Sequence, residues 1–210
     1  MFTGIVTAVG TVESSQQRGD LRVRIACPFD PEKIAIGASI ACSGVCLTVV
    51  ERALRQAQDE RGKAWFAVDV SAETLSRTAK DSWAEGTRIN LEPSLRLGDE
   101  LGGHIVSGHV DAVGTVEQVR AEGDSTRVTI VAPAALAPFV APKGSIALDG
   151  VSLTVNQVED RPDGSVAFGL NIIPHTAAVT TLGELGPGAE VNLEIDTLAR
   201  YLKRLESLRA

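Results

Sequence analysis

The stretch "SIACSGVCLTV" at residues 39–49 returns a little over a hundred residues later as "SIALDGVSLTV" at residues 145–155. Eight of the eleven positions are identical. The three that differ pair Cys42 with Leu148, Ser43 with Asp149, and Cys46 with Ser152. The apolar frame is therefore repeated while the reactive side chains change, which indicates a duplicated structural unit with two chemically different copies.

Further blocks repeat in the same order along the chain. "GIVTAVGTVE" (4–13) recurs as "GHVDAVGTVE" (108–117), and "GTRINLE" (86–92) recurs as "GAEVNLE" (188–194). The two copies differ in length only in polar stretches, and one of these, "RQAQDERGK", is expected to be an exposed loop. The offsets predict a first domain at 1–104, a second domain at 105–197 and a separate C-terminal segment at 198–210.

Within each copy the apolar runs are short, rich in Val, Ile, Leu and Thr, and separated by Gly, Pro or Asp. Five or six such runs in each copy, with little helix between them, predict a small closed antiparallel barrel, so the fold class is mainly β. The expected strands are 4–13, 21–27, 39–50, 65–71 and 88–92 in the first copy, and 109–117, 127–132, 145–155, 166–172 and 190–195 in the second. Short helices are expected at 72–83 and 132–140.

The last segment has a different pattern. Residues 196–210 place Leu198, Tyr201, Leu202, Leu205 and Leu208 along one face of a helix, with Arg and Lys toward its end. This pattern predicts an amphipathic α-helix whose charges suit the helix dipole. The apolar face could pack on another chain or on the helix's own barrel, and the sequence leaves both alternatives open.

Composition excludes several classes of protein. The net charge is −7 and the basic residues are scattered, so the electrostatic footprint of a nucleic-acid-binding protein is missing. No apolar run is long enough to span a membrane, and the N-terminal stretch is expected to be a strand and not a signal peptide. Three cysteines cannot form an all-disulfide framework, which favours a reduced, cytoplasmic setting.

Familiar catalytic motifs do not account for the chain. Cys42 and Cys46 lie four residues apart without a second cysteine pair, so a zinc site is not expected. The sequence holds no Gly-rich phosphate loop after a strand and no GxSxG elbow. His104 and His109 are an odd number of residues apart, so in a straight strand they would face opposite sides. Either histidine could have a packing role or a catalytic one.

Comparing the two copies position by position separates the positions that are kept from those whose side chains change in chemical type. The hydroxyl and glycine positions are kept, as in Gly4/Gly108, Ser39/Ser145, Thr48/Thr154 and Thr74/Thr176. The positions that change in chemical type are Ile5/His109, Gly37/Lys143, Ser43/Asp149, Cys46/Ser152 and Ser94/Asp196. Drift after duplication would also produce mismatches. It does not by itself explain why a base, two acids and a thiol lie beside the best-preserved blocks.

Five segments carry a resemblance to a known family: "MFTGIV", "CLTV", "DELGGHIVSGHVD", "DGVSLTV" and "NLEID". In these segments, in this order, and over essentially its whole length, the chain resembles the riboflavin synthases of the alpha type. The resemblance implies two tandem six-stranded antiparallel Greek-key barrels and a C-terminal helix that helps to form a homotrimer. It also implies association with lumazine synthase, and no nucleic-acid or membrane partner.

The activity that the resemblance implies uses one compound twice. Two molecules of 6,7-dimethyl-8-ribityllumazine give riboflavin and 5-amino-6-ribitylamino-uracil by transfer of a four-carbon unit, the last step of riboflavin biosynthesis. Such enzymes need no metal and no organic cofactor. The productive pair of rings would lie at an interface between two chains, with the first barrel of one chain against the second barrel of the next. Which barrel holds the donor stays open.

Site residues follow from the resemblance by position. For catalysis it implies Cys46 as nucleophile or water-activating thiol and His109 as proton carrier, assisted by Ser39, Asp149 and Asp196. In the first barrel the implied binding frame is Gly4, Ile5, Val6, Cys46, Leu47, Thr48, Val70, Ser71, Ala72, Glu73, Thr74 and Leu75. In the second it is Gly108, His109, Val110, Lys143, Ser152, Leu153, Thr154, Asn171, Ile172, Ile173, Pro174, His175 and Thr176.

The chain also departs from the family pattern. Where the family usually has "IPET", this sequence has "IPHT", so His175 replaces an acid. The main alternative function is a non-catalytic lumazine- or flavin-binding protein of the same fold, which should have lost the reactive residues that are present here. A flavin reductase barrel is a more distant alternative, and it would need a nicotinamide-binding domain.

Overall fold

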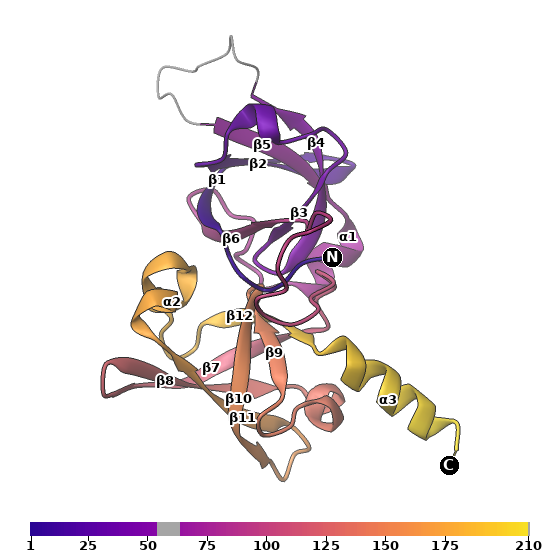
Figure 1. Cartoon of the computed structure of the whole chain (residues 1–210), viewed down its shortest axis with the longest axis vertical. Helices are drawn as coiled ribbons and strands as arrows, with labels where there is room; N and C mark the ends of the chain where they lie inside the picture. The colour runs from indigo at the N-terminus through magenta and orange to yellow at the C-terminus, as the bar shows by residue number, and fades with distance from the viewer. Residues whose placement is uncertain (54–63, 210) are drawn as a thin grey trace.

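The computed structural model describes residues 1–53 and 64–209, so the loop expected at "RQAQDERGK" lies outside the described residues. The chain forms two closed six-stranded antiparallel barrels, one above the other in Figure 1, and a helix that projects from the second barrel. The mainly-β prediction of two six-stranded barrels and a C-terminal helix is therefore confirmed.

The two barrels have the same strand order. The first consists of β1 (Ala8–Arg18), β2 (Asp20–Cys27), β3 (Ser39–Cys42), β4 (Val45–Arg52), β5 (Ala64–Val70) and β6 (Arg88–Pro93). The second consists of β7 (Ala112–Glu122), β8 (Ser125–Ala132), β9 (Ser145–Leu148), β10 (Val151–Asp160), β11 (Val166–Ile172) and β12 (Glu190–Ile195). In each barrel the second strand pairs with the fifth and the sixth closes the sheet between the third and the first, which is a Greek-key arrangement.

Equivalent side chains fill the two barrel cores. Val23, Ile25 and Phe66 are fully buried in the first barrel, and Val128, Ile130 and Phe168 take the corresponding places in the second. In β2 and β8 the two buried residues, Val23 and Ile25 or Val128 and Ile130, alternate with more exposed ones, as the period of a β-strand requires. The repeated apolar letters of the sequence therefore build one core twice.

The segment 39–50, expected as one strand, is a hairpin, so that prediction was wrong. β3 and β4 are joined by Ser43 and Gly44, which have φ angles of +43° and +83°. In the second copy Asp149 and Gly150 form the same turn, with φ angles of +45° and +79°. Only four residues precede each turn, and their unbroken apolar pattern hid it.

The short helices differ from the expected ones. The helix expected at 72–83 ends early, as α1 (Ala72–Arg77), because Thr78 is extended. The segment 132–140 contains the 3₁₀ helix η2 (Ala134–Phe139), which includes Pro138. Three further elements were not expected, namely α2 (Pro174–Val179) and the 3₁₀ helices η1 (Pro31–Lys33) and η3 (Thr181–Glu184).

The C-terminal helix α3 (Thr197–Ser207) confirms the amphipathic prediction. Asp196 caps its start by accepting a hydrogen bond from the Leu198 N–H at 2.8 Å. Asp111 accepts from both terminal nitrogens of Arg200, at 2.7 and 2.9 Å, and fixes the base of the helix to the second barrel. The apolar face stays in solvent, since its five large side chains are 56–67% exposed. No helix among the described residues is both long and apolar enough to cross a membrane.

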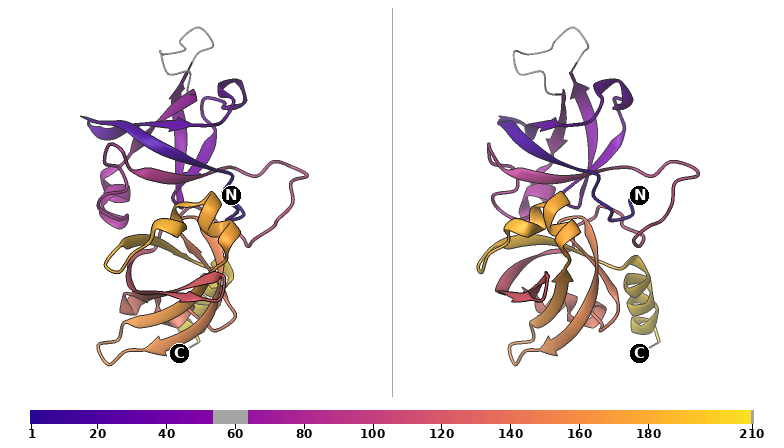
Figure 2. Two further views of the ribbon diagram at one scale, coloured as in Figure 1. Left: turned by 90° about the vertical axis from the view of Figure 1, so that its left-hand side faces the viewer. Right: turned by 60° about the vertical axis from the view of Figure 1, so that its left-hand side comes forward.

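The two barrels meet through a pair of matching contacts. The Asn90 side chain donates a hydrogen bond to the Asp149 carbonyl at 3.0 Å, and the Asn192 side chain donates to the Ser43 carbonyl at 2.9 Å. Gly44 and Gly150 lie against each other between these bonds, and a Cβ on Gly44 would come within 2.8 Å of the Gly150 nitrogen. In both views of Figure 2 the segment that follows β6 loops out to the right at the level of this junction before the chain enters the second barrel.

Candidate active site

The segment that precedes the first strand of each copy lies against the other copy's barrel. The Ser152 N–H donates to the Gly4 carbonyl at 2.8 Å, and the Cys46 N–H donates to the Gly108 carbonyl, also at 2.8 Å. A Cβ at either glycine would come within 2.5 Å of the Cβ of Ser152 or Cys46, so glycine is required at both positions. The two segments are thus exchanged between the barrels.

This exchange corrects the expected binding frames. Val6 packs against the core of the second barrel, and Val110 packs against the core of the first. Assigning Gly4–Val6 to the first barrel and Gly108–Val110 to the second was therefore wrong. Sequence order suggested that assignment, but β1 starts only at Ala8, and the residues before it cross to the neighbouring barrel.

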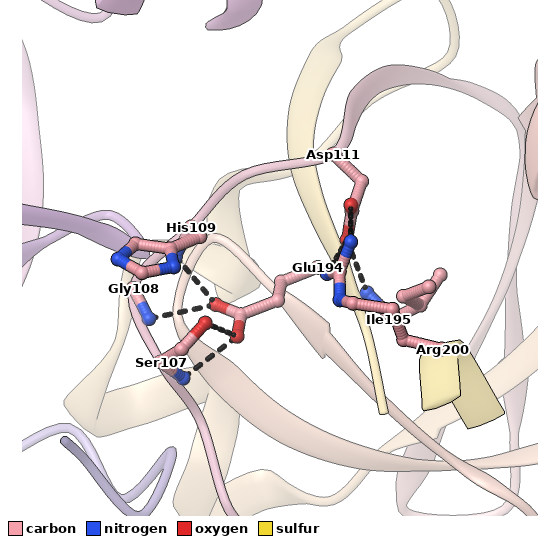
Figure 3. Close-up of polar contacts among 7 residues, drawn as sticks. All are labelled: Ser107, Gly108, His109, Asp111, Glu194, Ile195 and Arg200. Carbon is pink, nitrogen blue, oxygen red and sulfur yellow. Dashed lines mark hydrogen bonds and ion pairs between the residues drawn. The ribbon is translucent and has the colours of Figure 1, made fainter. Parts of the chain in front are cut away.

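A buried carboxylate holds each exchanged segment. Glu194 of β12 accepts hydrogen bonds from the N–H groups of Ser107, Gly108 and His109, at 2.7–3.1 Å, and from the Ser107 hydroxyl (Figure 3). Glu92 of β6 binds the N–H groups of Thr3 and Gly4 and the Thr3 hydroxyl in the same way. Burial raises the pKa of Glu92, and the hydrogen bonds from Thr3 and Gly4 lower it. Sequence reasoning did not assign these acids, although the repeated "NLE" contained the signal.

The first barrel has a cavity of about 380 Å³ next to Cys46. Its wall comes from β4, from α1 and from the exchanged segment that carries His109. Ser71 caps α1 by accepting from the Thr74 N–H, and its hydroxyl also lies 3.0 Å from that of Thr74. The lining residues are Val45, Cys46, Glu73, Thr74, Arg77, Thr78, Gly108, His109, Val110 and Asp111. The fold therefore brings Cys46, Thr74 and His109 together, as a site with a thiol and an imidazole requires.

Strand alternation distinguishes the three cysteines. Leu47 is buried in the barrel core, so its neighbours Cys46 and Thr48 lie on the outer face of β4. Cys42 is fully buried, and burial raises its pKa, as it raises that of Cys27. A thiol in such surroundings is a poor nucleophile. Cys46 is the cysteine that is accessible from a cavity.

The corresponding place in the second barrel is built around Ser152. Ile5, next to the Gly4 that binds Ser152, leaves about half of its surface exposed. Ile173 is equally exposed, and after it α2 begins at Pro174 without the side-chain cap that Ser71 gives to α1. His104 was not assigned to a site from the sequence, yet its Nδ1 lies 2.7 Å from the Ser152 hydroxyl oxygen. His104 and His109 do belong to different sites. His104 lies at Ser152 and His109 lines the Cys46 cavity, but strand alternation is not the cause, because their segment is mostly irregular.

Several expected residues do not line the Cys46 cavity. Ser39 faces a separate cavity of about 410 Å³ beside η1, and Asp149 lines one of about 550 Å³ between the barrels. Asp196 caps α3 and acts electrostatically on His104. Lys143 is exposed, with a φ angle of +67°, and its N–H donates to the Val155 carbonyl as that of Gly37 donates to the Val49 carbonyl.

The remaining expected binding residues lie in the two walls. In the first barrel, Val70 is buried, Ala72 and Glu73 are exposed, and Leu75 packs against the core. In the second, Leu153 and Ile172 join the core, while Thr154 and His175 are exposed and Thr176 is half-buried. The Asn171 side-chain oxygen is buried without a hydrogen bond among the described residues. The described part of the chain gathers no group of three or more His, Cys, Asp and Glu side chains that could hold a metal ion.

Asp149 has an unusual electrostatic environment. Burial raises its pKa to about 7, and the hydrogen bond that its carboxylate accepts from the Asn192 N–H lowers it. Its counterpart Ser43 accepts from the Asn90 N–H at the equivalent place. Asp149 is therefore a titratable group built into the contact between the barrels, and the first copy has a neutral hydroxyl there.

Comparison with known proteins gives matches over both copies. A family model described as "Lumazine binding domain" matches residues 3–94 and 107–196. A riboflavin synthase from Brucella abortus is 50% identical over 208 residues, which cover 98% of each chain. The chain belongs to the riboflavin synthase family. A riboflavin synthase from Mycobacterium tuberculosis is 42% identical over 207 residues, again 98% of each chain.

Solved structures agree with this fold. The crystal structure of LumP complexed with riboflavin superposes with a TM-score of 0.75 at 25% identity, covering 93% of this chain and 99% of that one. As a member of the riboflavin synthase family by full-length similarity, the chain is an enzyme with riboflavin synthase activity, a transferase of riboflavin biosynthesis.

Proposed function

We propose that each barrel binds one molecule of 6,7-dimethyl-8-ribityllumazine. One bound molecule passes a four-carbon unit to a second molecule in a barrel of the other type, which gives 5-amino-6-ribitylamino-uracil from the donor and riboflavin from the acceptor. Atoms balance between two substrates and the two products, so the reaction consumes no oxidant, reductant or further reactant. The observation that carries the proposal is the duplicated site. One backbone frame, with Gly108 at Cys46 and Gly4 at Ser152, is built twice and carries different reactive groups.

The first-barrel cavity contains the groups that this chemistry needs. The C7 methyl group of the electron-poor lumazine ring is acidic, and C7 itself accepts nucleophiles. Cys46 and His109 both line this cavity, so His109 would move a proton at the methyl group and Cys46 would add to C7 or activate a water that does. Thr74 and the backbone of β4 would bind polar groups of the ring and the ribityl chain. Holding the two rings close and oriented supplies the remaining rate enhancement.

The two rings would meet between copies of the chain. Within one chain large apolar side chains stay in solvent, with Ile5 48% exposed next to the Gly4 that binds Ser152, and Ile173 52% exposed at the start of α2. The apolar face of α3 is exposed as well, and its eleven residues are long enough to pack on other copies. These exposed apolar surfaces support association between chains, and the family resemblance makes that assembly a homotrimer in which the first barrel of one chain faces the second barrel of another. The three cysteines favour a cytoplasmic location. Association with lumazine synthase is part of the same proposal and rests on the family resemblance alone.

The assembly can be tested apart from the chemistry. Replacing Leu202 and Leu205 together by glutamate places charges on the apolar face of α3 and should lower the mass measured by analytical ultracentrifugation. Arg204→Glu, on the polar side of the same helix, should leave the mass unchanged. An unchanged mass in the double variant would contradict a role of α3 in assembly.

The reaction is tested by incubating the purified chain with 6,7-dimethyl-8-ribityllumazine and no additive. We expect riboflavin to appear, with two substrate molecules consumed for each riboflavin formed. The alternative function is a binding-only protein, which is favoured by the similarity to LumP, solved with riboflavin. Tight binding without any riboflavin formed would establish that alternative and overturn the proposal.

A further inference from the structure

His104 reaches the second-barrel site because of a close backbone contact. A Cβ on the preceding Gly103 would lie 2.1 Å from the Thr3 carbonyl oxygen and 2.8 Å from the Ser152 Cβ. The His104 N–H donates to the Thr3 carbonyl at 3.1 Å, and Phe2 and Val106 exchange hydrogen bonds at 2.7 and 3.1 Å beside it. The His104 backbone is therefore fixed by a short pairing between the starts of the two copies.

The imidazole of His104 makes one side-chain hydrogen bond, to Ser152. Its Nδ1 lies 2.7 Å from the Ser152 hydroxyl oxygen. Its Nε2 is buried and has no hydrogen-bond partner among the described residues. A buried N–H without an acceptor is rarer than an under-satisfied acceptor atom, so the favoured tautomer has its proton on Nδ1 and none on Nε2.

The surroundings of the His104 ring disfavour its charged form. Burial lowers the pKa of His104, while Asp196 and Glu194 raise it to a smaller extent. The Glu194 carboxylate is already occupied by the N–H groups of Ser107, Gly108 and His109. A charged imidazole would in addition put a second, unpartnered N–H on Nε2, which carries a desolvation cost.

We infer that His104 is a positioning residue of the second-barrel site, which donates from Nδ1 to the Ser152 oxygen and so turns the Ser152 hydroxyl proton toward a carbonyl oxygen or ring nitrogen of the bound heterocycle. A serine hydroxyl has one proton to donate, and an acceptor bond from His104 leaves that proton for the ligand. The inference rests on the proposed function, in that the second barrel must bind the lumazine. Cys46, at the equivalent place, lies against Gly108 and Phe2 and presents a thiol, which is a weaker donor.

The consequence is a difference in how the two sites bind the same ring. In the second barrel an oriented hydroxyl would hold an acceptor atom of the ligand and fix the ring without attacking it. In the first barrel a thiol stands at that place, beside His109. The His104–Ser152 pair would therefore bind and orient one substrate molecule, whereas Cys46 and His109 would carry out the catalytic steps.

The test compares three replacements of His104 in the full chain. The Asn side-chain nitrogen can occupy the place of Nδ1, whereas Gln places its amide near Nε2 and Ala removes the bond. The readouts are the dissociation constant for riboflavin, from flavin fluorescence quenching, and kcat/KM for 6,7-dimethyl-8-ribityllumazine. For the loss of one hydrogen bond we expect His104→Ala and His104→Gln to raise the dissociation constant and to lower kcat/KM, each by about 3- to 10-fold. Both values for His104→Asn should stay within about twofold of those of the unchanged chain.

A double-mutant cycle with Ser152→Ala completes the test. If His104 acts through the serine, His104→Ala should cause no further loss once the hydroxyl is gone. Equal losses in both backgrounds, unchanged values for Ala and Gln, or a failure of Asn to rescue would each overturn the inference. Thermal unfolding separates a fold defect from a binding defect, and the Asn and Gln variants keep the comparison usable if Ala unfolds. An unchanged chain that forms no riboflavin would instead overturn the proposed function.

Discussion

The Cys46 site of the first barrel and the Ser152 site of the second share their backbone contacts and differ in their side chains. Each has a strand N–H bonded to the carbonyl of a glycine from the other copy, and each glycine segment is held by a buried glutamate. One site presents a thiol beside His109, and the other a hydroxyl bonded to His104. The comparison shows that the two copies share the backbone frame of the site while the side chains at Cys46 and Ser152 differ.

The largest difference between the sites should appear in turnover. Cys46→Ser removes the proposed nucleophile and should lower kcat by about 100-fold or more, as expected for loss of a catalytic group. Ser152→Ala removes one binding hydroxyl and should cost about 10-fold at most, mainly in KM. Steady-state kinetics with 6,7-dimethyl-8-ribityllumazine gives both numbers. Comparable losses in kcat would contradict the division of roles.

The shared frame can be tested at its two carboxylates. Glu92→Gln and Glu194→Gln each put an amide N–H₂ where backbone N–H groups need an acceptor, so we expect each to lower the free energy of unfolding by about 2–3 kcal/mol. Urea unfolding measures this loss. Glu117→Gln is the matched control, since Glu117 makes only an exposed ion pair with Arg161 and should change the value by less than about 0.5 kcal/mol.

The exchange of segments predicts which barrel loses ligand binding in the Glu92→Gln and Glu194→Gln variants. Glu194 holds the segment at Cys46, and Glu92 holds the segment at Ser152. Each variant should therefore weaken ligand binding in the barrel to which its own strand does not belong. Binding lost in the same barrel as the altered strand would contradict the exchange.

The free energy of unfolding should depend on pH through Asp149 at the contact between the barrels, whereas its counterpart Ser43 does not titrate. The folded chain keeps a proton on Asp149 up to about pH 7, whereas the unfolded chain loses it near pH 4. Stability should therefore fall as pH rises through this window, by roughly 2 kcal/mol after allowance for partial exposure of the carboxyl. Asp149→Asn should flatten the profile, as should Asp149→Ser, which copies Ser43. Urea midpoints near pH 5 and near pH 8 measure this, and an unchanged slope in both variants would contradict it.

The smallest effect concerns Lys143, which has a φ angle of +67° where the first copy has Gly37. A side chain in this region costs about 1 kcal/mol, so Lys143→Gly should stabilise the fold by about that amount. If Lys143 also binds substrate, KM should rise in the same variant. Thermal unfolding and steady-state kinetics test the two effects separately. A less stable Lys143→Gly chain would show that the backbone strain is absent.

Much of the fold could be predicted because the duplication checks every expected element against its copy. The two barrels, their strands and the C-terminal helix followed from period-two runs and from one helical face of five large side chains. The turn at Ser43 was not predicted because the short strands on its two sides form one continuous apolar run in the sequence. α2 was not predicted because only Ile173 separates its first residue, Pro174, from the buried strand β11.

The site was predicted less completely, for a physical reason. Cys46, Thr74 and His109 were expected from position, and the structure brings them to one cavity. The exchange of Gly4–Val6 with Gly108–Val110 depends on contacts between the barrels, and sequence order gives no sign of them. The repeated "NLE" marks Glu92 and Glu194 as shared positions, but their roles and that of His104 depend on the same contacts and follow only from the three-dimensional arrangement.

The central claim is that each barrel of this chain binds one ligand of the same kind. Its most direct test is the number of riboflavin molecules bound per chain, measured by equilibrium dialysis for the unchanged chain and for two variants. Thr74→Trp would fill the first-barrel cavity, and Thr176→Trp would put the same bulk at the equivalent position of the second barrel. We expect about two bound molecules for the unchanged chain and about one for each variant, with both variants inactive. A single bound molecule in the unchanged chain, or full activity in either variant, would contradict the account.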